Sequence, residues 1–475
     1  MNTLPFPSPL ARASELQRVE FDRELIRRYD GKGPRYTSYP TADRFIEAYT
    51  AETYANWVGK RQLGAVSHTL SLYVHLPFCN TVCYYCACNK VITANRNHAD
   101  KYLDYLEREI AMQRALIEGP AKVDQLHFGG GTPTFLSDAQ LERLMTTIRH
   151  HFDLQPNGEF SIEIDPRKVA PATIALLARL GFNRMSVGVQ DVNPQVQQAV
   201  NRVQSIDDTI GAIKGARSHG FKSVSIDLIY GLPLQTPASM HETIRTVIDM
   251  DPDRIALYSY AHLPKLFKPQ RQIDEQQLPS AASKLDILQQ SVEQLLAAGY
   301  LYIGMDHFAK PGDELAVALR QGRLHRNFQG YSTHADCDML GLGVSAIGKV
   351  GPTYSQNQRS LDDYYDMIDR GELPIMRGMV LSADDLVRRA VIQALMCQFE
   401  LSFEPIETAY LIEFDSYFAS ELQRLQALAE DGLIQFEPGR LVVTPKGRFL
   451  VRVIAMVFDK YLQAEEASHR YSKVI

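Results

Sequence analysis

Four of the six cysteines of this chain lie between Cys79 and Cys88. The first three follow the spacing Cys79-x3-Cys83-x2-Cys86, and Cys88 comes two positions after Cys86. A cubic iron–sulfur cluster has four irons, so four thiolates would saturate it. Three thiolates would leave the fourth iron open to a ligand that does chemistry. The spacing therefore favours an iron–sulfur cluster held by this loop.

Other uses of the same cysteines stay open. A zinc site could take four thiolates, although no second, distant C-x2-C pair follows. A redox dithiol at Cys83 and Cys86 would leave Cys79 without a role. Packed structural thiols are disfavoured because the loop is polar around Asn80. No apolar stretch of a secretory signal precedes the loop, so we expect a reducing cytoplasmic compartment, where such a cluster indicates metal or redox chemistry.

Two further stretches carry candidate chemistry. The run GGGTP at 129–133 provides glycines that allow a backbone to approach a ligand closely, and a tight turn is the structural alternative. Glu163 lies inside the apolar run SIEID, where a carboxylate needs a partner. Simple pairing with Arg167 or Arg184 is the alternative to a ligand-binding role.

The elements that must position these residues alternate regularly. Helical patterns at 99–118 and 281–298 separate or follow short apolar runs that we predict as strands. These runs are 71–77, 125–130, 160–165, 184–190, 223–231, 254–262 and 301–308. Repeated strand–helix units indicate a parallel sheet, and six or more in series indicate a barrel or part-barrel. Its ligands would lie at the C-terminal ends of the strands, where the cysteines, the glycine run and Glu163 fall.

The two ends of the chain have a different character. Residues 1–55 are predicted as an N-terminal arm that covers the barrel mouth, because Pro34 and Pro40 interrupt any helix there. Residues 56–375 form the predicted catalytic barrel. Residues 376–475 contain helical stretches at 383–398 and 418–430 and then a hairpin that turns at Pro438-Gly439. This order predicts a mostly helical, winged-helix-like C-terminal domain.

Composition narrows the function further. The chain has 475 residues, 45% of them hydrophobic and 22% charged, which is typical of a globular protein. Its net charge of −6 argues against non-specific nucleic-acid binding. No apolar run approaches the roughly 20 residues of a membrane helix. We therefore expect neither nucleic acid nor membrane among its partners.

Several runs together resemble a known family. YVHLPFCNTVCYYC is similar to the cluster loop of the radical S-adenosylmethionine enzymes, which alone would indicate only that superfamily. Cys88 and the runs GPRYTSYPTA, GGGTPT, IDLIYGLP and LHRNFQGY resemble the oxygen-independent coproporphyrinogen III oxidases (coproporphyrinogen III dehydrogenases). The resemblance spans about residue 31 to the C-terminus. Ala87 stands where the family pattern has Gly, and alanine is its nearest substitute.

The resemblance implies roles for individual residues. Cys79, Cys83 and Cys86 would bind a 4Fe-4S cluster, while Cys88 would matter for activity without binding iron. His75 is by default a satisfied core histidine, but its place near the cluster loop gives it a candidate hydrogen-bonding or proton-relay role. Among the residues implied below to bind S-adenosylmethionine, the polar ones could instead line the barrel rim, and the apolar ones could belong to the core. The residues implied to bind S-adenosylmethionine are Tyr73, Tyr85, Gly130, Gly131, Thr132, Glu163, Gln190, Arg202, Asp227, Ala261, Phe328, Gln329 and Ile347.

The implied reaction is oxidative decarboxylation of two propionates of coproporphyrinogen III to vinyl groups, giving protoporphyrinogen IX in anaerobic heme biosynthesis. A 5′-deoxyadenosyl radical from S-adenosylmethionine would take the β-hydrogen. The implied cofactors are a 4Fe-4S cluster and two molecules of S-adenosylmethionine. The implied partner is an electron donor of the flavodoxin or ferredoxin type, and the chain would act as a monomer.

Two other functions stay open. A heme chaperone of the same superfamily would keep the cluster loop without decarboxylating anything; Cys88, the 36–40 arm and LHRNFQGY speak against it. A non-enzymatic iron–sulfur or zinc regulator would use the C-terminal domain on DNA, and the acidic balance disfavours it.

Overall fold

The computed structural model describes residues 18–61, 68–334 and 337–462. The chain divides into two compact units. The barrel unit comprises residues 42–294 and 336–381, and the C-terminal unit comprises the described parts of 1–41, 295–335 and 382–475. None of the described helices is long and apolar enough to cross a lipid bilayer.

One mixed sheet forms the barrel unit, with the strand order β16-β15-β14-β13-β1-β4-β5-β6-β7-β8. From β13 to β8 in this order each pair is parallel, and the remaining three pairs are antiparallel. The parallel strands are β1 (Leu70–Leu76), β4 (Lys122–Gly130), β5 (Asp153–Ile164), β6 (Arg184–Gln190), β7 (Ser223–Tyr230), β8 (Arg254–Ser259) and β13 (Asp338–Leu342). The antiparallel ones are β14 (Ile347–Val350), β15 (Thr353–Asn357) and β16 (Ile375–Val380).

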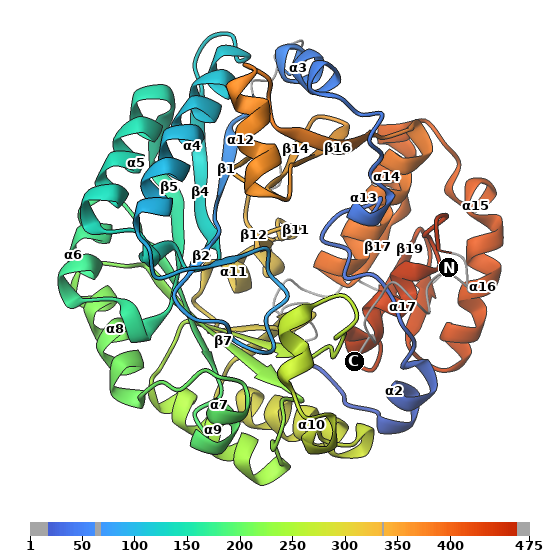
Figure 1. Ribbon diagram of the computed structural model, residues 1–475. Coiled ribbons are helices and arrows are strands. Elements are labelled where there is room, and N and C mark those ends of the chain that lie inside the picture. Colours follow the sequence, from blue (N-terminus) through green and yellow to red (C-terminus); the bar gives the residue numbers. More distant parts are fainter. Residues whose placement is uncertain (1–17, 62–67, 335–336, 463–475) are drawn as a thin grey trace. The chain divides into compact units, whose positions relative to one another are not determined.

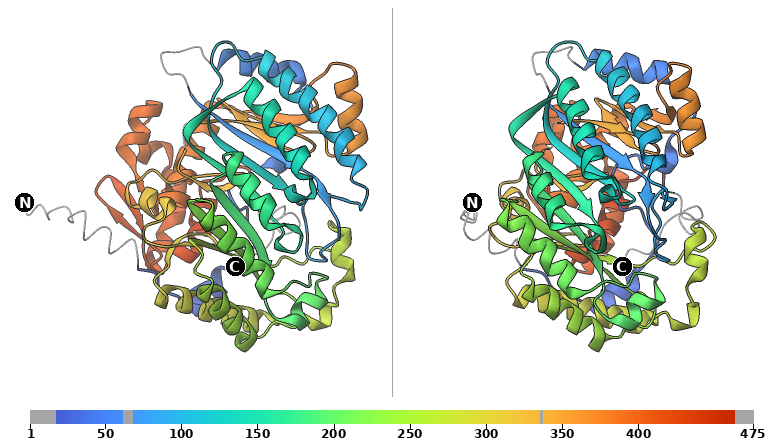
Figure 2. Two further views of the ribbon diagram at one scale, coloured as in Figure 1. Left: turned by 90° about the vertical axis from the view of Figure 1, so that its left-hand side faces the viewer. Right: turned by 60° about the vertical axis from the view of Figure 1, so that its left-hand side comes forward.

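Helices follow the parallel strands and cover the outer face of this curved sheet (Figure 1; Figure 2). Parallel strands covered in this way are buried on both faces, and Leu72, Val74 and Phe128 accordingly have no exposed surface. The helices are α4 (Asn97–Ala115), α5 (Asp138–His151), α6 (Pro171–Arg179), α7 (Pro194–Ala199), α8 (Ile206–Ser218) and α9 (Pro237–Asp249), while α10 (Ala281–Ala297) leads out of the unit. The predicted α/β part-barrel is confirmed.

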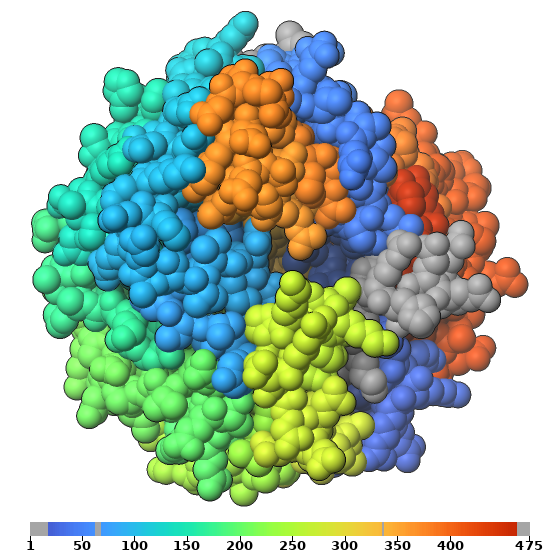
Figure 3. All heavy atoms as spheres, in the orientation of Figure 1, coloured from blue at the N-terminus to red at the C-terminus, as the bar shows by residue number. Residues whose placement is uncertain are grey.

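Two shorter helices complete the barrel unit. These are α3 (Ala51–Lys60) and α12 (Leu361–Asp369). Asp369 at the end of α12 accepts hydrogen bonds from Tyr105 and Arg108 of α4, so the last helix of the unit packs beside its first long one. Figure 3 shows the α12 segment in orange against the light-blue α4 region.

The prediction of one strand over 301–308 was wrong. Two antiparallel strands, β9 (Leu301–Gly304) and β10 (His307–Ala309), occupy this stretch in the C-terminal unit. Gly304 and Met305 have φ of 141° and 51°, which reverses the chain between them. The six earlier predicted strands are all present. Strand β5 begins seven residues before its predicted start, and the other ends differ by at most three residues.

The C-terminal unit contains the predicted helices as α13 (Ala383–Gln398) and α16 (Ala419–Glu430). The predicted hairpin is β18 (Ile434–Glu437) with β19 (Arg440–Val443), and β17 (Glu400–Ser402) pairs with β19. Shorter elements are α2 (Arg23–Tyr29), α11 (Glu314–Arg320), β11 (His325–Asn327), β12 (Gly330–Ser332), α14 (Phe403–Tyr410), α15 (Phe414–Tyr417) and α17 (Val451–Met456). The domain after 382 is mostly helical, as predicted.

The arm around residues 34–39 is bound within this unit by residues of and after α17. Arg452 Nε donates to Pro34 O (2.9 Å), and the Tyr36 hydroxyl donates to Asp459 (3.0 Å). The arm is not entirely irregular, because α2 precedes this stretch and is capped by its N-terminal aspartate.

Candidate active site

The four clustered cysteines line one cavity of about 290 Å³ in the barrel unit, at the C-terminal ends of its strands. The loop that carries them is closed at its base by a two-stranded parallel ladder of β2 (Phe78–Cys79) and β3 (Val91–Ile92). Both ends of the loop are thereby fixed beside β1. The strand-end position is the one that the sequence pattern predicts for ligands.

Side chains from two other segments also hold the loop. Asn201 Nδ2 donates to Val82 O (2.8 Å). Gln270 Nε2 donates to the carbonyls of Tyr85 (3.0 Å) and Ala261 (3.2 Å). These hydrogen bonds to backbone carbonyls hold the loop without involving its thiols. The four cysteines line the cavity.

The thiols themselves have polar neighbours. Cys79 Sγ lies 3.5 Å from Thr132 Oγ1, and Arg202 Nη1 donates to Cys83 Sγ over 3.6 Å. Burial raises the pKa of Cys79 to about 11, so metal binding there must displace a proton. The Arg202 guanidinium places a positive charge beside the Cys83 sulfur.

Cys86 and Cys88 form a pair. A hydrogen bond from the Cys88 thiol holds the pKa of Cys86 below its ordinary value. As a whole residue Cys88 is exposed, whereas Cys79, Cys83 and Cys86 are half-buried. Soft thiolates converging on one cavity fit an iron–sulfur cluster, and Cys79, Cys83 and Cys86 suffice for three irons.

The glycine turn after β4 borders the same cavity. Gly130 has φ of 115°, and a Cβ there would lie 2.7 Å from the His75 ring. A Cβ on Gly131 would lie 2.7 Å from the backbone of Pro77 and Phe78. Both glycines are therefore required by the packing of β1 and the cluster loop, whatever ligand the turn also binds.

Glu163 at the end of β5 reaches into the cavity, with 42% of its side chain exposed. It accepts hydrogen bonds from His127 Nε2 and from the Gly130 amide, each 3.2 Å long. Burial alone would raise its pKa, but these donors outweigh burial, and the pKa of Glu163 lies below its ordinary value. The site thus holds a carboxylate in its charged form.

The simpler pairings considered for Glu163 are not formed. Arg167 pairs instead with Asp165 (2.5 Å), and Arg184 donates to the side chain of Asn183 (2.9 Å). The carboxylate of Glu163 is thus left to the cavity and to its two donors.

His127 is a contributor that the sequence reasoning missed. Its Nδ1 lies 2.6 Å from Ser161 Oγ, and its ring stacks on Tyr73 at 5.9 Å and 13°. Ser161 lies directly across from His127 in the β4–β5 register. The imidazole is therefore fixed on three sides with Nε2 toward Glu163.

Arg202, which follows α7, and Asp227, which lies on β7, also line the cavity. Arg202 Nη2 donates to Gly188 O (2.6 Å), and its Nη1 lies 3.5 Å from Asp165. Asp227 accepts from Ser186 Oγ (2.9 Å), and burial raises its pKa to about 7.

Gln190 closes β6 in an unusual conformation. Its φ is 70°, a left-handed value that is uncommon for a residue with a side chain. Its amide nitrogen would lie 3.0 Å from a Cβ on Gly188, so the amide folds over that glycine. Such conformations concentrate at functional sites.

His75 is a satisfied, buried histidine that does not line the cavity. Its Nε2 donates to Asn89 O (2.9 Å), so Nδ1 accepts from the Tyr73 hydroxyl (3.0 Å). Burial lowers its pKa, which keeps the ring neutral. Its contacts give it a place in the wall that supports Gly130.

The structure brings together most of the predicted residues and leaves some outside the cavity. Those that line it are Cys79, Cys83, Cys86, Cys88, Tyr85, Gly130, Gly131, Thr132, Glu163, Gln190, Arg202 and Asp227. Tyr73, His75, Ala261 and Ile347 belong to the same unit without lining it, and Phe328 and Gln329 lie in the β11–β12 turn of the C-terminal unit.

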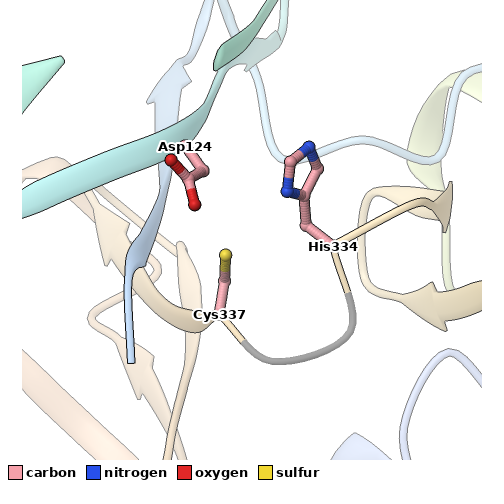
Figure 4. A group of neighbouring side chains, drawn as sticks. All are labelled: Asp124, His334 and Cys337. Carbon is pink, nitrogen blue, oxygen red and sulfur yellow. The ribbon is translucent and has the colours of Figure 1, made fainter. Parts of the chain in front are cut away.

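The two remaining cysteines are buried, as predicted for structural residues. Cys397 lies on α13, and Cys337 precedes β13 with its thiol 3.2 Å from Thr69. Figure 4 shows Cys337 with Asp124 of β4, their ligand atoms within 4.8 Å. His334, also drawn there, belongs to the C-terminal unit, so we assign no site to the three.

Comparison with known proteins places this site in a family. The model of the Radical SAM superfamily matches residues 73–247, and that of the HemN C-terminal domain matches residues 381–450. The oxygen-independent coproporphyrinogen III oxidase of Pseudomonas aeruginosa is 51% identical over 97% of this chain and 100% of its own length. That of Escherichia coli is 47% identical over 97% of this chain and its full length. The solved Escherichia coli structure, described as a Radical SAM enzyme, has a TM-score of 0.89 and covers 94% of this chain and 100% of its own.

The part-barrel with a three-cysteine loop at its strand ends is that of the radical S-adenosylmethionine enzymes, which use a 4Fe-4S cluster and S-adenosylmethionine. Within them, the chain belongs to the oxygen-independent coproporphyrinogen III oxidase family.

Proposed function

We propose that this chain converts coproporphyrinogen III to protoporphyrinogen IX by oxidative decarboxylation of two propionate side chains. The observation that carries the proposal is the single cavity in which the cluster-loop thiols, the glycine turn and the charged Glu163 meet. Full-length relatives with names of this activity support it.

Within the cavity, Cys79, Cys83 and Cys86 would hold the 4Fe-4S cluster. Cluster and S-adenosylmethionine together supply one-electron radical chemistry when bound. The chain's own residues would bind and orient the cofactor and the substrate, and would exclude water from them. The fixed loop and its buried walls suit that role, because oriented groups need no rearrangement when the reaction occurs.

The S-adenosylmethionine contacts are proposals from the family pattern and the cavity lining. The turn Gly130–Thr132 would receive the methionine amino and carboxylate groups. Glu163 would accept hydrogen bonds from the ribose, which its charged form does well. The other proposed contacts are Tyr73, Tyr85, Gln190, Arg202, Asp227, Ala261, Phe328, Gln329 and Ile347.

Two further residues have proposed roles in the reaction, Cys88 directly and His75 indirectly. Cys88, whose thiol is hydrogen-bonded to Cys86, would keep its thiol unbound by iron near the reacting atoms. His75 would act through its hydrogen bonds, since a neutral ring with both nitrogens bonded is a poor proton carrier.

The wider setting is part of the proposal. We propose two S-adenosylmethionine molecules per chain, one for each propionate, and an electron donor of flavodoxin or ferredoxin type. We further propose a monomer that acts in the cytoplasm, with residues 1–55 as an arm, 56–375 as the catalytic barrel and 376–475 as the C-terminal domain.

An anaerobic incubation tests the function. Reconstituted chain, reductant, S-adenosylmethionine and coproporphyrinogen III should give protoporphyrinogen IX, and the Cys83→Ser variant should give neither cluster absorption nor product, because a serine hydroxyl is a poor iron ligand at neutral pH. A heme titration of the same protein tests the alternative that the chain is a heme chaperone without decarboxylase activity. Stoichiometric heme binding without turnover would contradict the proposal.

A further inference from the structure

Lys90 lines the cavity at the end of the cluster loop and binds the loop's own backbone. Its ammonium donates to Cys86 O over 3.1 Å and to Cys88 O over 3.3 Å. A single cation thus contacts both residues of the Cys86–Cys88 pair.

The charge of Lys90 is not offset by a carboxylate. Within the described ranges 18–61, 68–334 and 337–462, no carboxylate oxygen lies within 4.0 Å of its ammonium. Arg202, whose guanidinium also contacts a thiol, differs because Asp165 lies 3.5 Å from that guanidinium. Lys90 therefore contributes an unpaired positive charge at the cluster loop.

Holding the loop does not require that charge. The β2–β3 ladder fixes both ends of the loop, and Asn201 and Gln270 bind its carbonyls with neutral amides. A neutral amide at position 90 could bind the same kind of acceptor. A full charge at this position instead acts on whatever charge the thiols carry.

The potential of an iron–sulfur cluster depends on nearby charge and hydrogen bonds. Reduction adds a negative charge, and a fixed cation close by stabilises that state. We propose that the charge of Lys90 raises the reduction potential of the cluster, so that an external donor reduces it more readily. This inference rests on the proposed function, since it requires the cluster at Cys79, Cys83 and Cys86.

Three variants separate charge from tethering. Lys90→Gln keeps a donor for the carbonyls but removes the charge, Lys90→Met removes both, and Lys90→Arg keeps both. The measurement is an anaerobic redox titration followed by electron paramagnetic resonance, at one pH and ionic strength because salt screens charge. Iron and sulfide content are determined on the same samples.

Lys90→Gln and Lys90→Met should hold the cluster and shift its midpoint to more negative potential by similar amounts, while Lys90→Arg stays near wild type. Lys168→Gln is the matched control, because Lys168 lines the same cavity, is exposed and has no bond to the loop. Its midpoint should move much less than that of Lys90→Gln, because solvent screens the exposed ammonium of Lys168.

A full cluster with unchanged potential in Lys90→Gln would overturn the inference, as would an equal shift in Lys168→Gln or Lys90→Arg. Loss of the cluster in Lys90→Gln would also overturn it, since Lys90 would then be a tether. A wild-type chain that takes up no cluster would contradict the proposed function itself.

Discussion

At the scale of the residue, the site depends on how Glu163 is held. Two donors, His127 and the Gly130 amide, keep its carboxylate charged and aimed into the cavity. His127 escaped the sequence analysis because a lone histidine on an apolar strand is usually core. Its partner is 36 residues away, and only the parallel β4–β5 register brings the two together.

Glu163→Ala should leave the cluster intact and weaken S-adenosylmethionine binding about ten- to hundredfold. This change in affinity corresponds to the loss of one charge-assisted hydrogen bond, which contributes roughly 1.5–3 kcal/mol. Calorimetry on the reconstituted chain measures it. His127→Phe should weaken binding less, and adding it to Glu163→Ala should change little more, because it acts through that carboxylate.

The control is Glu159→Ala. Glu159 lies on the same face of β5 as Glu163, but its carboxylate accepts a hydrogen bond from Gln125 and does not line the cavity. This variant should bind S-adenosylmethionine as wild type does. Unchanged affinity in Glu163→Ala would make Glu163 a structural residue.

Cys88→Ser should behave unlike the other three cysteine variants. Three thiolates already satisfy three irons, so the cluster and its absorption should persist while most product formation is lost. Iron content and product yield on one anaerobic preparation measure both effects. Loss of iron would make Cys88 a ligand, and full yield would make it a packing residue; either result contradicts the expectation.

At the scale of the element, the glycine turn and the cluster loop form one packed unit. Gly131→Ala should lower the free energy of unfolding by about 1–3 kcal/mol, because the added methyl meets the Pro77–Phe78 backbone at 2.7 Å. Chemical denaturation of matched preparations measures this change. Gly211→Ala on α8, with no atom within 4 Å, should instead raise stability by about 0.5–1 kcal/mol. Equal effects at both positions would show that the turn is not tightly packed.

Hydrophobic patterning predicted the first six strands and their parallel arrangement because each is a short apolar run followed by a helix. It did not predict β13–β16. Strand β15 reads TYSQN, and all five residues are buried, so polar side chains occupy core positions there and no apolar alternation marks the strand. The 301–308 run looked like one strand because its apolar pattern continues across a turn that Gly304 and Met305 make.

The cysteine loop was the strongest sequence signal for the site, since its spacing is local. Gln190 could be named only through the family pattern, because its left-handed backbone has no mark in the sequence. Contacts made across the sheet, such as those of Asn201 and Gln270 to the loop, depend on tertiary structure and left no local pattern.

At the scale of the whole barrel unit, Glu109 of α4 ties the first strand–helix pair to the last strands. It is fully buried and accepts from the Gly343 amide (2.7 Å), Asn357 (2.7 Å) and Tyr364 (2.6 Å). Burial raises its pKa to about 7 from an ordinary 4.5.

This shift makes stability depend on pH. A raised carboxyl pKa means that the native state binds the proton more tightly than the unfolded state does. The protonation of Glu109 therefore adds to the free energy of unfolding below pH 4.5, and this stabilisation is lost as the pH rises to about 7. Relative to Glu109→Gln, which does not titrate there, wild type should lose up to about 1.4 kcal/mol per pH unit in this window. Urea unfolding at pH 5, 6 and 7 measures it. A difference that stays constant with pH would contradict the shift.

The central claim is that the three-cysteine cavity carries out two oxidative decarboxylations that consume S-adenosylmethionine. Carbon dioxide, methionine and divinyl product, quantified together in one anaerobic reaction of the reconstituted chain, test it most directly. Wild-type chain should release two carbon dioxide and two methionine per protoporphyrinogen IX, and Cys83→Ser should give none of the three. Methionine release from a full cluster without carbon dioxide or vinyl product would show that the cavity does not decarboxylate this substrate.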